Sequence, residues 1–307
     1  MKKIKTNQVS LRRKKSLNTS YKDYFFVLPL IIVMAVFLAY PIIKAAVMSV
    51  QYWYMPKPKP EGNYFVGIDN YVSLFGDASF IHSLKITAIY IIVTVVLRFV
   101  IGLLAALLMN QSFRGRGFAR ALLIIPWAIP EVVACLIWIL MYDKDFGIIN
   151  YLAMNFKLIS EPVGFLSNPE IALPAAMAVN VWKGFPFVAI MLLAGLQSIP
   201  TELYEAARVD GAKPFQQFRN ITWPMLRPVS MVVFLLLIIW TIKDFGIVYL
   251  LARGGPSQAT EILTIFIYHS AFKYFDFGKA AAAGMIMLVF SIIFTYIYLK
   301  VLNKEEY

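Results

Sequence analysis

Five ionisable side chains stand inside long apolar segments of this 307-residue chain. They are Arg98, Glu131, Lys183, Lys243 and Asp244. A charge in the core of a bilayer costs about 2.5–3.5 kcal/mol on insertion scales, so each one needs a partner or a water-filled path. At similar depths the five groups indicate a polar passage for a hydrophilic solute. The alternative is a set of purely structural pairs between helices, and the residue types fit both.

Arg98 and Glu131 each lie about eleven residues from the inner end of their segment, which at 1.5 Å per residue places both roughly 16 Å deep. Matched depth predicts an ion pair between two antiparallel helices. Trp182, Phe185 and Tyr249 could stack on the faces of sugar rings, although aromatic residues in such segments also serve in packing. Prolines interrupt the backbone hydrogen bonds of a helix, which membrane proteins tolerate near cavities. The third and fourth segments are therefore expected to line the passage, since they contain Pro126, Pro130, Pro174 and Pro186.

The elements that must position these groups are transmembrane helices. Hydrophobic residues make up 60% of the chain and charged residues 15%, with a mean hydropathy of +0.69, which excludes a water-soluble globular protein. A helix needs about 20 apolar residues to cross the hydrocarbon. Six stretches are long enough, at about 24–50, 85–109, 119–141, 170–196, 229–251 and 279–302. The sequence therefore predicts an all-α, polytopic membrane protein, with a basic tail over 1–23 and a single transmembrane domain over 24–307.

The formal net charge of +12 is distributed as an orientation signal, which argues against nucleic acid as a partner. Eight basic residues and one acid lie in the tail before the first span. With that tail inside, the inner segments carry seventeen Lys and Arg residues against eight in the outer loops. By the positive-inside rule both termini are expected to be cytoplasmic. The first span is too long for a cleavable signal and is expected to act as an anchor.

The sequence holds no set of residues that marks an enzyme or a metal site. Its single cysteine, Cys135, falls inside the third span, and His82 and His269 lack a second ligand at metal spacing. There is no clustered nucleophile and base, and no glycine-lysine phosphate-binding loop of the Walker type. We therefore expect a transport subunit that binds no cofactor and leaves ATP hydrolysis to another protein.

The polar stretch 197–228, between the fourth and fifth spans, is patterned like a helical hairpin. Thr201 is a suitable N-cap for a first short helix, and Gly211 can adopt the left-handed conformation that ends it. Pro214 suits the first turn of a second helix, which Trp223-Pro224 is expected to stop. The sequence thus predicts a bent pair of short helices parallel to the membrane.

Two interpretations of this hairpin fit its composition. It could lie on lipid headgroups as an amphipathic surface. Ala206 and Ala207, however, leave a bare surface that another backbone could approach closely, while Glu205 and Asp210 would be repelled by anionic lipid. These residues favour a groove on a second protein.

Four motifs follow one another between residue 110 and the C-terminus. They are Arg114-Gly115-Arg116-Gly117 with Pro126-Trp127, Trp182-Lys183-Gly184-Phe185-Pro186-Phe187, Glu205-Ala206-Ala207 with Asp210-Gly211-Ala212, and Gly254-Gly255-Pro256 with Thr260 and Gly278-Lys279-Ala280. In order and spacing they resemble the permease subunits of ATP-binding-cassette (ABC) importers, in the carbohydrate-uptake group that includes maltose-type and glycerol-phosphate-type permeases. Arg253 departs from the pattern, since a small polar residue is common there.

The resemblance implies a fold like that of type I ABC importer permeases, with six transmembrane helices, in a bacterial cytoplasmic membrane. It also implies that the hairpin docks into a cleft on a separate ATPase, which holds ATP and Mg²⁺. Glu205, Asp210 and Gly211 are then coupling residues, with Ala206 and Ala207 as the close-contact surface. The implied partners are a second, related permease, two ATPase subunits and an extracytoplasmic sugar-binding protein.

The cargo that the resemblance implies is a mono- or oligosaccharide. Because Arg98, Lys183 and Lys243 outnumber Glu131 and Asp244, a phosphorylated polyol of the glycerol-phosphate type is the alternative within the class. An ion-coupled secondary transporter is the alternative outside it, although such carriers more often contain internal repeats and need no docking hairpin. The sequence leaves open which sugar is carried and whether the two permeases are identical.

Overall fold

The computed structural model describes residues 21–60 and 62–305, and within them the side chains of residues 27–60 and 62–300. Most of the basic tail predicted over 1–23 lies outside the described residues. The chain divides into two compact units after Ala45. The first contains α1 (Tyr21–Met34), the π-helical turn η1 (Ala35–Ala39) and the start of α2 (Tyr40–Ser49). The apolar stretch Val27–Ser49, which runs from α1 to the end of α2, is long enough to cross a membrane.

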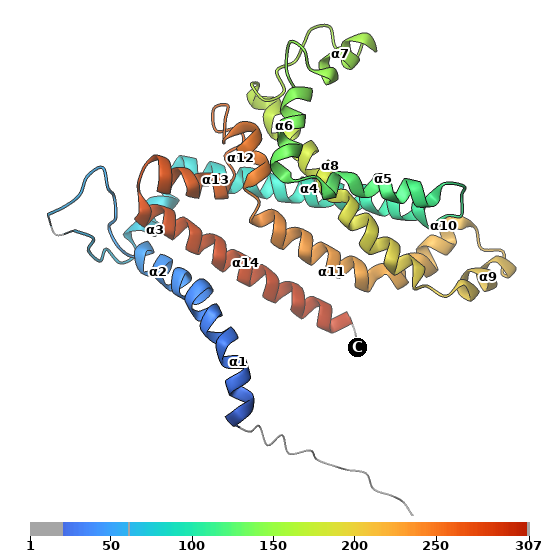
Figure 1. Cartoon of the computed structure of the whole chain (residues 1–307), viewed down its shortest axis with the longest axis horizontal. Helices are drawn as coiled ribbons and strands as arrows, with labels where there is room; N and C mark the ends of the chain where they lie inside the picture. The colour runs from blue at the N-terminus through green and yellow to red at the C-terminus, as the bar shows by residue number, and fades with distance from the viewer. Residues whose placement is uncertain (1–20, 61, 306–307) are drawn as a thin grey trace, which may run out of the picture. The chain divides into compact units, whose positions relative to one another are not determined.

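The second unit is built on four long helices, α4 (Ala78–Asn110), α8 (Pro169–Gln197), α11 (Trp223–Ile242) and α14 (Phe277–Glu305) (Figure 1). The pair formed by α4 and α8 is the most extensive. Gly102 on α4 allows their close approach, because a Cβ there would lie 2.6 Å from the Cβ of Val188 on α8. Leu192, Leu226 and Val233 belong to the same buried apolar core.

Among the described residues, five helices are long and apolar enough to cross a membrane. A sixth span is added if the bent pair of α5 (Arg116–Ala128) and α6 (Glu131–Met141) counts as one. This agrees with the six predicted spans. The all-α, polytopic fold class predicted from the sequence is confirmed.

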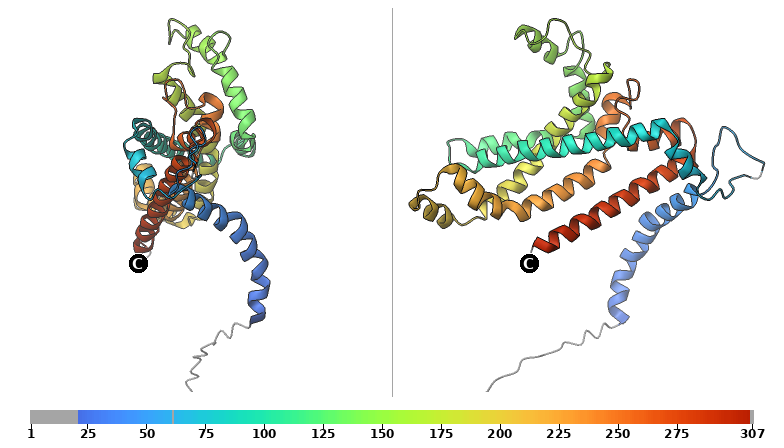
Figure 2. Two further views of the ribbon diagram at one scale, coloured as in Figure 1. Left: turned by 90° about the vertical axis from the view of Figure 1, so that its left-hand side faces the viewer. Right: turned by 180° about the vertical axis from the view of Figure 1, so that it is seen from behind.

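The third span is not the continuous helix that the apolar stretch 119–141 predicts. It breaks at Ile129 and Pro130, and α6 leaves α5 at an angle of 94°. Proline has no N–H to donate and disfavours the helical conformation at the residue before it. Ile129 accordingly has an extended backbone, with φ −65° and ψ 132°. As a result α6 projects from the side of the bundle, followed by α7 (Ile148–Asn155) (Figures 1 and 2).

The fifth span differs from its prediction at both ends. The expected stop at Trp223-Pro224 is wrong, because α10 (Pro214–Gln217) and the π-helical turn η2 (Phe218–Thr222) continue directly into α11. A π-helical turn just before Pro224 accommodates the missing N–H. At the other end the helix stops at Ile242, and a three-residue break precedes α12 (Gly246–Ala252). The hairpin therefore contains one separate short helix, α9 (Thr201–Val209), whose N-cap is Pro200 and not the predicted Thr201.

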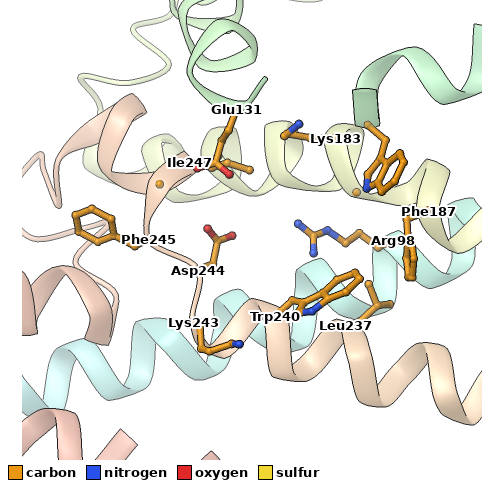
Figure 3. A pocket seen from close by; sticks show the side chains of 13 residues that line it. Arg98, Glu131, Lys183, Phe187, Leu237, Trp240, Lys243, Asp244, Phe245 and Ile247 are labelled. Carbon is orange, nitrogen blue, oxygen red and sulfur yellow. The ribbon is translucent and has the colours of Figure 1, made fainter. Parts of the chain in front are cut away.

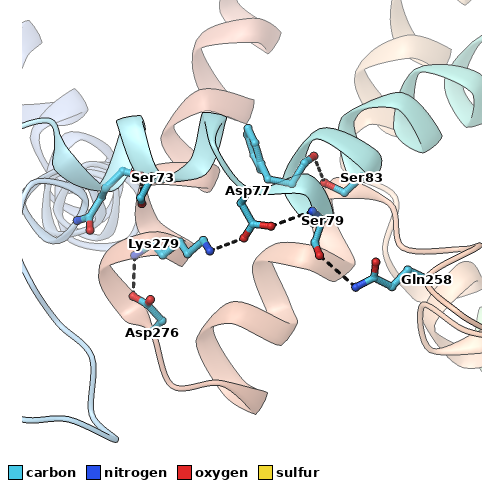
Figure 4. A network of polar contacts seen from close by, with 9 residues as sticks. Ser73, Asp77, Ser79, Ser83, Gln258, Asp276 and Lys279 are labelled. Atoms are coloured by element: carbon cyan, nitrogen blue, oxygen red, sulfur yellow. Dashed lines mark hydrogen bonds and ion pairs between the residues drawn. The ribbon is translucent and has the colours of Figure 1, made fainter.

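Short elements connect the long helices: α3 (Asp69–Phe75), α13 (Leu263–Tyr268) and the π-helical turn η3 (His269–Lys273). Asp77 joins two of the long helices at this end (Figure 4). One of its carboxylate oxygens caps α4 by accepting a hydrogen bond from the N–H of Ser79 at 2.8 Å. The other forms an ion pair with Lys279 at the start of α14.

Candidate functional site

A cavity of about 400 Å³ lies among α4, the break between α5 and α6, α8 and the break between α11 and α12 (Figure 3). Its lining combines charged, aromatic and glycine residues. They are Arg98, Trp127, Glu131, Lys183, Gly184, Phe187, Leu237, Trp240, Lys243, Asp244, Phe245, Gly246 and Ile247. The five ionisable residues singled out in the sequence are all in this set.

The aromatic residues predicted to lie with them, Trp182, Phe185 and Tyr249, are not part of this lining. Trp182 packs edge-on against Trp138 of α6, with ring centroids 5.5 Å apart. Tyr249 stacks on Phe245 at 4.7 Å and meets the edge of Tyr268 at 4.9 Å. Their rings therefore take part in packing between helices, next to the cavity but outside its lining.

Asp244 lies in the break after α11 and is held there by three other helices. Its carboxylate accepts hydrogen bonds from the hydroxyl of Tyr90 at 2.7 Å and from the side-chain amide of Asn180. Its backbone carbonyl accepts one from the hydroxyl of Thr264 at 2.6 Å. Tyr90 and Asn180 are completely buried. A half-buried carboxylate with these partners fixes the position of the break, and with it the adjoining cavity wall.

Arg98 is buried, and its guanidinium group binds other residues than the predicted partner, Glu131. Its Nε donates to the backbone carbonyl of Asn180 at 3.1 Å and its Nη1 to the hydroxyl of Thr241 at 3.5 Å. Arg98 and Glu131 line the same cavity, yet within the described part of the chain they form no ion pair. The predicted pairing assumed a straight third span, whereas Glu131 is the first residue of a helix that turns away.

Lys183 stabilises the break in the third span. Its Nζ donates to the backbone carbonyl of Ile129 at 2.6 Å. The bend removes this carbonyl from the helical ladder, because the first bond after the break runs from the N–H of Ala134 to the carbonyl of Pro130. Lys183 thus supplies a donor to a backbone group that would otherwise be unpaired inside a membrane.

Glu131 and Lys243 are the cavity charges that point to open space. Both residues are exposed, and in the part of the chain that the structure describes neither has a hydrogen bond or ion pair. The carboxylate of Glu131 rests against the Cα of Gly246, since a Cβ at that glycine would overlap it. These two side chains come from the two helix breaks and are available to a ligand.

An aromatic wall that the sequence prediction omitted completes the cavity. The ring of Phe187 lies 6.3 Å from that of Trp127 and 4.9 Å from that of Trp240. Helical spacing could have indicated two of them, because Phe187 follows Lys183 by four positions and Trp240 precedes Lys243 by three. Aromatic faces bind the C–H faces of sugar rings, and the nearby charges can bind their hydroxyls.

At the far end of α8, the short helix α9 presents the predicted coupling residues. Glu205, Ala206, Asp210 and Gly211 are exposed and Ala207 is half-buried. Gly211 has a φ of +75°, which confirms the left-handed helix end. The underside of α9 is held by a 2.9 Å hydrogen bond between the hydroxyls of Tyr204 and Thr222. Val209, which the sequence analysis did not select, is 89% exposed beside them.

The chain is similar in sequence to known transport proteins over most of its length. A family model described as "binding-protein-dependent transport system inner membrane component" matches residues 98–304. The chain is 37% identical over 283 residues to the trehalose/maltose transport system permease protein of Thermococcus litoralis, covering 91% of this chain and 92% of that protein. It is 30% identical over 286 residues to the sn-glycerol-3-phosphate transport system permease protein of Agrobacterium fabrum, covering 92% and 94%.

A solved structure has a similar fold. A chain of the bacterial alginate ABC transporter, in complex with alginate pentasaccharide-bound periplasmic protein, aligns with a TM-score of 0.77 at 25% identity. The match covers 91% of this chain and 92% of that chain. The arrangement of the membrane helices is therefore one already seen in an ABC transporter.

Proposed function

The chain belongs to the family of binding-protein-dependent transport system inner membrane components, and from that premise we propose that it conducts a carbohydrate through the cavity between its two helix breaks. It is a transport subunit of an ABC importer, and a separate subunit hydrolyses the ATP. The relative in T. litoralis is named for trehalose and maltose. A neutral mono- or oligosaccharide is the cargo that we propose here.

The observation that carries this proposal is the meeting of aromatic rings and polar groups in one cavity. Trp127, Phe187 and Trp240 form an apolar wall, and Glu131 and Lys243 stand at its open side. A sugar has apolar faces and hydroxyl edges, so both kinds of surface can be used at once. The cavity lies inside the membrane-spanning helices, as a transport path requires.

A phosphorylated polyol is a second candidate cargo. It is favoured by one observation, the excess of Arg98, Lys183 and Lys243 over Glu131 and Asp244 in the cavity lining. The relative in A. fabrum is named for sn-glycerol 3-phosphate. A thermal-shift screen of the cognate binding protein decides between the two, with maltose, trehalose and sn-glycerol 3-phosphate as probes.

We propose that α9 transmits force from the ATPase. The exposed Glu205, Ala206, Asp210 and Gly211 form its docking face, with Ala207 behind them and Val209 as an apolar contact. The assembly would contain a second, related permease, two ATPase subunits with ATP and Mg²⁺, and an extracytoplasmic sugar-binding protein. The charge distribution supports a bacterial cytoplasmic membrane location with both termini cytoplasmic.

The test is ATP-dependent uptake by the complex in proteoliposomes. Glu205→Lys and Gly211→Pro should abolish uptake and stimulated ATP hydrolysis while the chain remains in the membrane. Glu161→Lys makes the same charge change at an exposed site in the loop after α7 and should leave both activities intact. Uptake by this chain alone, driven by an ion gradient, would contradict the proposal.

A further inference from the structure

A series of aromatic rings leads away from the wall of the cavity. Phe245 lines the cavity (Figure 3) and stacks on Tyr249 of α12, with ring centroids 4.7 Å apart. Tyr268, at the end of α13, lies 5.2 Å from Phe245 and 4.9 Å from Tyr249. Phe272 of η3 lies a further 5.2 Å from Tyr268. The rings thus follow one another across α12, α13 and η3.

The series continues to the loop between α2 and α3. Phe277, at the start of α14, lies 6.5 Å from Phe272, and Trp53 lies 6.0 Å from Phe277. Trp53 lines a second cavity, of about 250 Å³, in that loop. Figure 1 places α3, beside this loop, and α9 at opposite ends of the long helices. We call the series the aromatic ladder, and it consists of Phe245, Tyr249, Tyr268, Phe272, Phe277 and Trp53.

The rings of the aromatic ladder stay partly open while their neighbours form the core. Val248, next to Tyr249 in α12, and Ile265 of α13 are completely buried in one apolar cluster. All six ladder residues are half-buried or exposed, and Phe272 is 62% exposed. These elements therefore bury aliphatic side chains and leave the ladder rings toward the surface, where a ligand can reach them.

A belt of aromatic residues at the membrane surface does not account for this arrangement. Belt residues gather at the depth of the lipid headgroups. The aromatic ladder instead runs from a cavity among the membrane helices to a cavity in a connecting loop. A flat ring offers its face to the C–H face of a sugar, and the hydroxyls of Tyr249 and Tyr268 can bind sugar hydroxyls. Closely spaced rings offer such a face again at each step.

We propose that the aromatic ladder is a track that receives the carbohydrate at the extracytoplasmic loop and passes it to the cavity beside Glu131. The inference rests on the proposed carbohydrate cargo. Because neighbouring rings make similar contacts, a sugar can move from one to the next without being trapped. A sugar that leaves the track early is lost to the outside although ATP has been hydrolysed. The ladder therefore raises the amount of sugar imported per ATP.

Uptake and ATP hydrolysis by the complete transporter in proteoliposomes test the track, with maltose and trehalose as probes. Phe272→Leu and Phe277→Leu keep an apolar side chain and remove the flat face. Each should lower the amount of sugar imported per ATP hydrolysed about two- to tenfold, the loss expected for one aromatic contact. A variant that folds poorly lowers uptake and hydrolysis together, so a purely structural defect leaves this ratio unchanged.

Two further variants are the controls. Phe272→Trp retains a flat ring and should keep the ratio of the unmodified transporter. Phe290→Leu makes the same change as Phe272→Leu at a 56% exposed position in the middle of α14, outside the ladder, and should also leave the ratio unchanged.

Two results would overturn the inference, and they can be told apart. If both leucine variants of the ladder import as much sugar per ATP as Phe290→Leu, the rings only pack against one another, and the carbohydrate cargo still stands. If the unmodified transporter imports neither sugar, the proposed cargo itself fails and the ladder loses its role. Uptake of sn-glycerol 3-phosphate in that case identifies a cargo that has no ring face to stack.

Discussion

The Nζ of Lys183 lies 2.6 Å from the carbonyl oxygen of Ile129, the residue at which the third span breaks. This bond links α8 to the bend between α5 and α6. It explains why a positive charge occurs in the middle of an apolar helix. The ammonium group of Lys183 donates a hydrogen bond to a backbone carbonyl that the bend leaves without a helical partner. The same bend places Glu131 at the cavity.

Replacing Lys183 by methionine should destabilise the chain. The substitution keeps an unbranched side chain and removes the donor, so the carbonyl of Ile129 is left unsatisfied at a cost of about 1–3 kcal/mol. Lys183→Arg retains a donor and should be less harmful. Thermal unfolding of the purified transporter measures both. A methionine variant that melts at the same temperature as the unmodified chain would show that the bond contributes nothing.

Gly246→Ala should impair transport with little loss of stability. The new Cβ would occupy the place of the Glu131 carboxylate. Because that carboxylate is the end of a flexible side chain, it can swing away, and it is then lost from the cavity. Uptake kinetics should show a raised KM, and Gly246→Ala should have no further effect in a Glu131→Ala background. Gly284→Ala is the control, since a Cβ there meets no atom within 4 Å.

The membrane spans and the residues that supply the charges of the cavity could be predicted from the sequence, because apolar length and a charge within an apolar stretch are both local signals. Lys183 and Lys243 are conspicuous for that reason. The break at Pro130 could not be predicted with its angle, since proline in a membrane helix is tolerated with or without a sharp bend. The prediction of an ion pair between Arg98 and Glu131 was wrong because of this break. Two residues at equal depth are close to each other only if both helices are straight.

The residues that the sequence prediction missed depend on three-dimensional neighbours. Tyr90 and Asn180 are ordinary polar residues in apolar helices until Asp244 is placed between them. Trp240 becomes a cavity residue only because α11 ends two positions later. Helical spacing from a charged residue indicates which aromatic residues could line a cavity, such as Trp240 near Lys243. Which of them do line it depends on the tertiary packing.

Tyr90→Phe should destabilise the chain through Asp244. The change removes one of two side-chain donors to a half-buried carboxylate, with an expected cost of about 1–3 kcal/mol in the free energy of unfolding. In an Asp244→Asn background the same change should cost less, because the charge that needs the donor is gone. Tyr296→Phe, at an exposed tyrosine of α14, is the control. Additive effects of the Tyr90 and Asp244 changes would contradict the proposed positioning role of this pair.

The ion pair of Asp77 with Lys279 should make stability depend on pH (Figure 4). Burial opposes the charged form of Asp77, but the hydrogen bond and charge of Lys279 and the N–H of Ser79 together lower the pKa of Asp77 below its ordinary value. The neighbouring Asp276 acts in the opposite sense, because burial raises its pKa. A pH curve of the unmodified chain therefore mixes the two carboxylates.

Comparison with Asp77→Asn separates them. A lowered pKa means that the folded chain binds the proton of Asp77 more weakly than the unfolded chain does, so the ion pair stabilises the fold above the ordinary aspartate pKa of about 3.9. That stabilisation, at most about 1 kcal/mol for a partly exposed pair, is lost as the pH falls through the lowered pKa. The unmodified chain should thus melt above Asp77→Asn at neutral pH, and the difference should vanish in acid. A difference that stays constant with pH would mean that the charge of Asp77 contributes nothing to the junction between α4 and α14.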